Sequence, residues 1–208
     1  GAVQATLIDM HCEATSEKHP KVRRAVARAL GGFQTLAAAR VLERLALKDP
    51  SYLVAAEALR SLGKTRDKRA LDVLRERIDS KSWADVVRAG ALDGLSALRD
   101  DEAVPDLIKR TRYGYPNRGR RAAVAALARL SDSRKVRRHL EDLLDDRDPH
   151  VRSDVVSALA SLGDPRCRAA LRRALEQELD GRVARRIREA LRDIGDAGSN
   201  ERKRMSDD

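Results

Sequence analysis

The sequence predicts an all-α protein, a right-handed α-solenoid built from stacked antiparallel helix pairs. Three observations lead to this prediction. A motif of Ala or Gly followed by Leu recurs along the 208 residues, no segment shows the sustained alternation of a half-buried strand, and aromatic residues make up only 2% of the chain. Ala, Leu and Val supply nearly all of the apolar 42%, which suits closely packed helices, and the charged 37% needs the large surface of an elongated array.

The recurring motif has a large apolar residue three positions after its leucine. Its leucines are Leu30, Leu59, Leu95, Leu127, Leu159 and Leu191. Neighbouring copies lie 29 to 36 residues apart, and the last three intervals are all 32 residues. Such a period is typical of helix-pair repeats, which bury their apolar stripe only by stacking on one another. We therefore expect a single array of about six helix pairs over residues 1–195.

The fifth repeat shows how the residues specify one helix pair. Asp148-Pro149 provides an N-cap acceptor before a proline at the first helical position. Gly163 can adopt the left-handed conformation that ends the helix, and Asp164-Pro165 begins the next one. In the second repeat, Gly63 is expected to end a helix in the same way. In the fifth repeat, an apolar stripe at helical spacing lies between Pro149 and Gly163. Its residues are Val151, Val155, Ala158, Leu159 and Leu162.

The end of the array is expected near Gly195. The last helix, at about residues 182–194, is rich in Arg and Glu, as the outer face of a terminal half-repeat should be. The residues after it show no periodicity. We therefore predict a disordered tail over residues 196–208.

The segment from Asp148 to Arg166 has the form Asp-Pro-x-Val-Arg…Ala-Leu-x-x-Leu-Gly-Asp-Pro-Arg. This form resembles the HEAT repeat, in particular its bacterial HEAT-like variety, and the resemblance extends over nearly all of residues 18–195. Members of that family stack helix pairs and bind proteins, nucleic acids or, occasionally, pigments. The resemblance therefore implies a scaffold or accessory domain that makes protein–protein or interdomain contacts.

A narrower resemblance comes from the series His19-Pro-Lys-Val-Arg-Arg-Ala-Val, Asp49-Pro-Ser-Tyr-Leu-Val-Ala-Ala-Glu-Ala-Leu, Leu62-Gly-Lys-Thr-Arg-Asp, Val87-Arg-Ala-Gly-Ala-Leu and Thr111-Arg-Tyr-Gly. The series is similar to the C-terminal helical region of bacterial M1-family zinc aminopeptidases, which closes over the catalytic domain. The zinc signature His-Glu-x-x-His of that family is absent here. The resemblance thus implies a C-terminal domain without the catalytic chemistry, and we expect that this chain is not itself an enzyme.

Basic residues are concentrated between Lys109 and His139. That segment holds eleven Lys and Arg residues against the single acid Asp132, so its charge equals the formal net charge of +10 of the whole chain. The candidate partner-binding residues in it are Tyr113, Tyr115, Arg118, Arg120 and Arg121. These side chains could bind phosphates or an acidic peptide.

The alternative is that the arginines of this segment pair with carboxylates of neighbouring repeats. Arg88, Arg152 and Arg185 occupy comparable places in other repeats, which favours such a ladder for part of the set. Arg137, in contrast, is expected to be exposed. The predicted function is accordingly a protein-binding scaffold, and the second hypothesis is a nucleic-acid-binding protein that uses the basic fourth repeat.

The sequence contains no pattern that predicts a catalytic site, a metal site or a cofactor site. The adjacent pair His11-Cys12 has poor geometry for chelation, because neighbouring residues on a helix point about 100° apart. Cys12 and Cys167 are far apart and fit a reducing, cytoplasmic compartment, and the two resemblances imply a bacterial protein. No apolar run approaches the roughly 20 residues that span a bilayer, so we expect no membrane contact. We also expect the protein to be a monomer.

Overall fold

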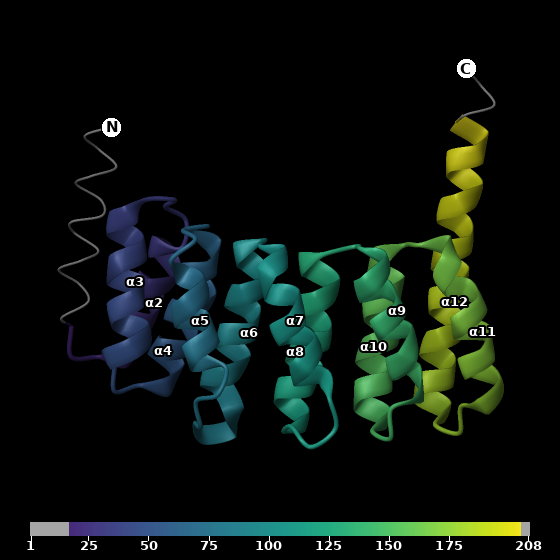
Figure 1. The fold of residues 1–208 in the computed structure, drawn as a ribbon, viewed down its shortest axis with the longest axis horizontal. Coiled ribbons are helices and arrows are strands. Elements are labelled where there is room, and N and C mark those ends of the chain that lie inside the picture. The colour runs from purple at the N-terminus through teal and green to yellow at the C-terminus, as the bar shows by residue number, and fades with distance from the viewer. Residues whose placement is uncertain (1–16, 205–208) are drawn as a thin grey trace. The chain divides into compact units, whose positions relative to one another are not determined.

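The computed structural model describes the backbone of residues 17–204 and the side chains of residues 17–195. Within this range the protein forms helices and no strand (Figure 1). The α-helices are α2 (Pro20–Leu30), α3 (Leu36–Lys48), α4 (Tyr52–Lys64), α5 (Ala70–Arg77), α6 (Val86–Leu98), α7 (Val104–Thr111), α8 (Asn117–Leu130), α9 (Arg134–Asp142), α10 (Pro149–Leu162), α11 (Arg168–Gln177) and α12 (Gly181–Arg204). The predicted all-α fold of helix pairs is confirmed.

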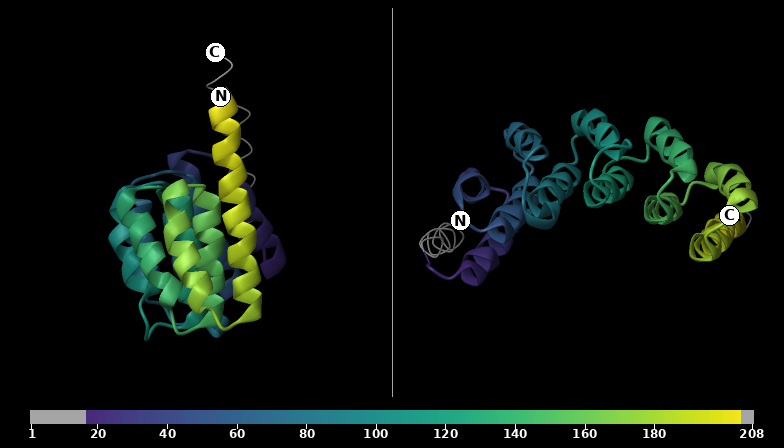
Figure 2. Two further views of the ribbon diagram at one scale, coloured as in Figure 1. Left: turned by 90° about the vertical axis from the view of Figure 1, so that its right-hand side faces the viewer. Right: turned by 90° about the horizontal axis from the view of Figure 1, so that it is seen from below.

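The chain divides into two compact units between Ala126 and Leu127, where the sequence predicts a single array. In the N-terminal unit, α4 packs against both α2 and α6, while α3 lies beside α4 and α5 lies beside α6. Figure 2 shows these helices in two layers, with α2, α4 and α6 in one layer. In the C-terminal unit, α10 packs against α9 and α12, and α11 packs against α12.

The helix ends follow the capping signals of the sequence. The Asp148 side chain accepts a hydrogen bond of 2.8 Å from the amide of His150, and Pro149 opens α10. Gly163 ends that helix with a φ of 64°, as predicted. Thr35 caps α3 in a similar manner, since its hydroxyl accepts from the amide of Ala38.

The repeat leucines form the core. Leu30, Leu59, Leu95, Leu127 and Leu159 have no exposed surface. Their equivalent in the last helix, Leu191, is partly exposed, as expected at the end of a stack. The hydrophobic register that predicts the fold is therefore confirmed.

Gly63 does not end a helix, contrary to the sequence prediction. It lies inside α4, and Arg66, two residues beyond the helix, takes the left-handed conformation with a φ of 56°. A Cβ atom at Gly63 would meet the carbonyl oxygen of Gly94, and one at Gly90 would lie 2.6 Å from the carbonyl oxygen of Ala56. These glycines instead allow the backbones of α4 and α6 to touch.

The last helix continues beyond the predicted end of the array. The backbone of α12 remains helical to Arg204, so residues 196–204 are helical where the sequence predicts a disordered tail. The single glycine in this stretch, Gly198, costs about 1 kcal/mol in a helix relative to alanine. Ala197 and the run from Glu201 to Arg204 are good helix formers, and they offset part of that cost.

The backbone contact between α4 and α6 predicts a contrast between two glycine-to-alanine substitutions. Gly90→Ala should lower the free energy of unfolding by about 1–3 kcal/mol, because the new methyl group must displace the backbone of α4. Gly181→Ala, in open space at the start of α12, should have no cost or a small gain. Urea denaturation of both variants checks this, and equal effects would contradict the close approach.

Candidate functional site

The predicted site lies on the loop from the end of α7 to the start of α8, in the N-terminal unit. Gly114, with a φ of 98°, allows the loop to turn between Tyr113 and Tyr115. The guanidinium carbon of Arg120 lies 5.9 Å from the centre of the Tyr113 ring, and that of Arg110 lies 4.7 Å from the centre of the Tyr115 ring. Each cation is attracted to the electron-rich face of its ring, and both contacts fix the loop.

Both of these arginines are buried, with exposed fractions of 4% for Arg110 and 1% for Arg120. Arg110 forms an ion pair of 2.5 Å with Asp79, in the loop that precedes the third repeat. The Nε atom of Arg120 donates a hydrogen bond of 2.8 Å to the carbonyl oxygen of Thr111. The two side chains therefore hold the loop in place from beneath and are not available to a partner.

The five candidate residues thus differ in their placement. Tyr113 is 74% exposed, and Arg118 and Arg121 are also exposed, whereas Tyr115 is only partly exposed and Arg120 is interior. Arg110 is a functional support that the sequence analysis did not single out. The sequence signal that could have identified Arg110 is its spacing of 33 residues from Arg77, which is close to the repeat period. Arg77 likewise reaches back to the preceding repeat, where it donates to the carbonyl oxygens of Ala46 and Leu47.

Arg120 belongs to a recurring feature that we call the arginine clasp. In a clasp, an arginine near the start of a helix donates to a backbone carbonyl in the loop before that helix or at the end of the preceding helix. The donors are Arg23 to Glu17 and Lys18 (2.8 and 2.9 Å), Arg88 to Ile78 (2.9 Å), Arg120 to Thr111 (2.8 Å) and Arg152 to Asp146 (2.7 Å). Arg185, grouped above with Arg88 and Arg152, is exposed, and Ala184 occupies the clasp position of the last repeat.

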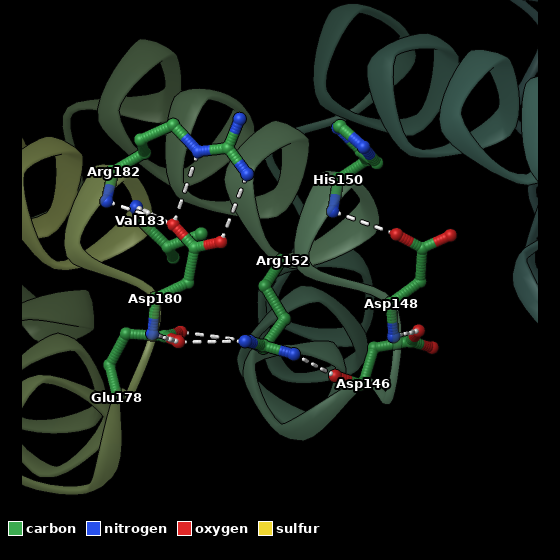
Figure 3. Close-up of polar contacts among 8 residues, drawn as sticks. All are labelled: Asp146, Asp148, His150, Arg152, Glu178, Asp180, Arg182 and Val183. Atoms are coloured by element: carbon green, nitrogen blue, oxygen red, sulfur yellow. Dashed lines mark hydrogen bonds and ion pairs between the residues drawn. The ribbon is translucent and has the colours of Figure 1, made fainter.

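The clasp of the C-terminal unit shows the geometry in detail (Figure 3). Arg152 lies between the carboxylate of Glu178, with contacts of 2.7 and 2.8 Å, and the carbonyl oxygen of Asp146. Asp180 accepts hydrogen bonds from the amides of Arg182 and Val183 and so caps α12. A groove of about 400 Å³ beside this clasp is lined in part by Asp145, Ala174 and Leu179.

The prediction that Arg137 is exposed is wrong. Its exposed fraction is 8%, and its guanidinium lies 2.6 Å from Glu141 and 3.1 Å from Asp164. A long side chain can bury its aliphatic stem while its charged end meets carboxylates, and charge alone does not reveal this. The segment from Lys109 to His139 is therefore not one basic surface, because Arg110, Arg120 and Arg137 are interior.

Reactive or metal-binding side chains are scarce in the described part of the chain. Cys167 is buried, and burial together with the nearby carboxylates of Glu141 and Asp164 raises the pKa of its thiol to about 11, so the thiol is protonated at neutral pH. No group of three His, Cys, Asp or Glu residues in the described range could hold a metal ion. The pair His11-Cys12 lies outside the described residues. None of the described helices is long and apolar enough to cross a membrane.

A family model described as HEAT repeats matches residues 8–96, 44–128 and 104–192. The chain therefore belongs to the HEAT repeat family. No curated protein sequence matches it.

Three solved structures are similar to this chain at low sequence identity, and one of them has a TM-score above 0.5. The X-ray structure of YIBA_ECOLI has 18% identity and a TM-score of 0.53, with 89% of this chain and 81% of that chain covered. Human deoxyhypusine hydroxylase in complex with glycerol has 19% identity and a TM-score of 0.48, with 90% and 84% covered. The complex of CpcE and CpcF of phycocyanin lyase from Nostoc sp. PCC7120 has 18% identity and a TM-score of 0.49, with 90% and 94% covered.

The expectation that this chain is not an enzyme is corrected by these comparisons. Two of the similar structures carry the names of a hydroxylase and a lyase, so the lack of a recognised catalytic motif in this sequence does not make the chain a non-enzyme. At these identities the likeness is one of fold, and it transfers no reaction to this chain.

The clasp predicts different effects on stability for substitutions of two arginines that are two residues apart. Arg120→Gln should lower the free energy of unfolding by about 1–3 kcal/mol, because the carbonyl of Thr111 and the face of Tyr113 lose a buried charged partner. Arg118→Gln should leave stability unchanged, since Arg118 is exposed. Chemical denaturation measures both, and a larger loss for Arg118→Gln would refute the assignment.

The clasp of the C-terminal unit predicts a pH dependence. The hydrogen bonds from Arg152 hold the pKa of Glu178 below its ordinary value of 4.5. A lowered folded-state pKa stabilises the fold above the unfolded value, and this contribution is lost as pH falls through the folded value. The difference in unfolding free energy between the wild type and Glu178→Gln should be constant from about pH 7 to 5 and shrink below about 4.5. A difference that stays constant down to about pH 3 would contradict this prediction.

Proposed function

We propose that this protein is a binding scaffold whose array makes protein–protein or interdomain contacts, with the loop around Tyr113 as part of its contact surface. The observation that carries the proposal is an exposed tyrosine on a rigid support. Tyr113 is 74% exposed, while its ring is held by the buried guanidinium of Arg120. A large aromatic side chain that is already fixed loses little conformational entropy on binding, and such residues often anchor protein interfaces.

The neighbouring residues fit this role. Tyr115 and Arg120 support the loop, and Arg118 and Arg121 add exposed positive charge beside Tyr113. Positive charges at the rim of an interface steer an acidic partner and increase the rate of association. Tyr113 would then supply most of the affinity, and the arginines would supply orientation.

A narrower version of the proposal makes the partner an adjoining catalytic domain of the M1 aminopeptidase type. It is supported by the sequence series described above, whose last member, residues 111–114, forms the Tyr113 loop. Sequencing the gene upstream of residue 1 tests this version. An in-frame domain with His-Glu-x-x-His would support it, and a different domain or a non-coding region would exclude it.

Nucleic-acid binding is the second candidate, and the exposed Arg112 and Arg118 on either side of Tyr113 favour it. The buried positions of Arg110, Arg120 and Arg137 weigh against it, because interior arginines cannot neutralise phosphates. A protein partner is therefore the better supported reading.

Photo-crosslinking distinguishes these two functions. A photoreactive amino acid at position 113, in the chain expressed in its own organism, should give adducts that protease removes and nuclease leaves intact. The same amino acid at position 37, an exposed site on α3, is the control and should give no specific adduct. Adducts at position 113 that disappear with nuclease would instead establish nucleic-acid binding.

A further inference from the structure

The exposed apolar side chains of the N-terminal unit gather at one place in the repeat. Among the large apolar side chains that are exposed in the described residues of this unit, the single exception is Leu36, at the start of α3. The others all lie close to the start of α2, α4, α6 or α8: Val22 (43% exposed), Tyr52 (52%), Leu53 (48%), Trp83 (74%) and Tyr113 (74%). Scattered exposed apolar residues need no explanation, but their recurrence at one repeat position indicates a surface.

The loops that carry these residues share one edge of the N-terminal unit. Figure 1 shows the connections from α3 to α4, from α5 to α6 and from α7 to α8 along its lower side. We call this surface the loop edge and define it as residues 49–53, 79–85 and 112–118. The connections within each helix pair lie at the opposite ends of the helices, so the loop edge is separate from them.

The loop before α6 is strained in a way that keeps Trp83 in solvent. Ala84 and Asp85 adopt left-handed conformations with φ values of 48° and 58°, which cost non-glycine residues about 1 kcal/mol or more each. Arg88 holds Asp85 at 2.5 Å, and the Ser82 hydroxyl accepts a hydrogen bond from the amide of Val87. A strained turn that exposes the largest side chain of the protein does not serve the core, and it is consistent with a binding role.

The exposed charge of the loop edge is positive. Its carboxylates are engaged by arginines that lie in the interior: Asp49 by Arg23, Asp79 by Arg110 and Asp85 by Arg88. The exposed charged side chains in and next to the loop edge are the basic Lys48, Lys81, Arg112 and Arg118, together with one acid, Asp79, whose carboxylate is paired with the buried Arg110. These ion pairs neutralise the negative charge of this surface, and the remaining basic side chains make it complementary to an acidic partner.

We propose that the loop edge binds an acidic protein segment that carries apolar side chains, an inference that rests on the proposed function and names the partner's chemistry. The apolar side chains of the segment pack against Tyr52, Trp83 and Tyr113, and its carboxylates contact the basic residues between them. Leu53 is aliphatic and offers no flat face for base stacking, which favours a polypeptide over a single-stranded nucleic acid. The surface is already formed, so binding requires no rearrangement of the array.

Synthetic peptides of defined composition test the inference with the full chain. The probe is a fluorescein-labelled peptide of alternating Glu-rich and Leu-rich stretches that lacks aromatic residues. It should bind saturably and shift the emission of Trp83, the only tryptophan of the protein, to shorter wavelength. Peptides with Lys in place of Glu, or Ser in place of Leu, should bind at least about 10-fold more weakly, because each removes one of the two kinds of contact.

Matched substitutions locate the binding surface. Trp83→Ala, Leu53→Ala and Arg118→Gln should each weaken binding of the acidic peptide, by about 10-fold for the first. The controls are Leu36→Ala, which removes an apolar residue of similar exposure away from the loop edge, and Arg40→Gln on α3. Controls should stay within about 2-fold of the wild type. Circular dichroism and melting temperature verify that every variant is folded.

Three results would overturn the inference: no saturable binding of the acidic peptide, equal losses in the controls, or tighter binding of a single-stranded oligothymidine. Crosslinking separates this failure from failure of the proposed function. Protein adducts from position 25, an exposed site on α2, with none from positions 53, 83 or 113, would refute the loop edge and preserve a protein-binding scaffold. No protein adduct from any of these positions would refute both.

Discussion

The packing of successive repeats depends on how each one satisfies the backbone of the loop that enters it. The last carbonyls of a helix have no partner within that helix, and a loop packed against the next repeat is shielded from water. Arg23, Arg88, Arg120 and Arg152 solve this by donating to loop carbonyls while their stems fill the interior. Without these donors each junction would bury unpaired oxygens, so the same arginines that join helix pairs also determine the conformation of the loops.

The fold could be predicted from the sequence because its signals are periodic and local. The leucine register from Leu30 to Leu159, the cap at Asp148 and the end of α10 at Gly163 follow from helix periodicity and end chemistry alone. The role of Gly63 could not be predicted from local sequence signals, because it depends on the close approach of Gly94 in another helix. A glycine at a helix end and a glycine at a crossing have the same local sequence context, and only the packing separates them.

The candidate site was predictable only in part, for a similar reason. The segment around Tyr113 was visible as a run of aromatic and basic residues, but exposure does not follow from charge. Arg120 and Arg137 are interior and Arg118 is exposed, although all three come from the same basic stretch. The partners that draw the first two inward are a carbonyl at Thr111 and carboxylates at Glu141 and Asp164, which only the three-dimensional arrangement brings within reach.

The clasp also affects how such a protein can change over evolutionary time. Because the Nε atom of Arg88 donates to the main-chain carbonyl of Ile78, the identity of the exposed Trp83 is not constrained by that bond. New specificities can then arise through substitutions at positions such as 83 without any repair of the core. Duplication of one helix pair would also add a further loop in the same register, which makes the array modular in binding as well as in architecture.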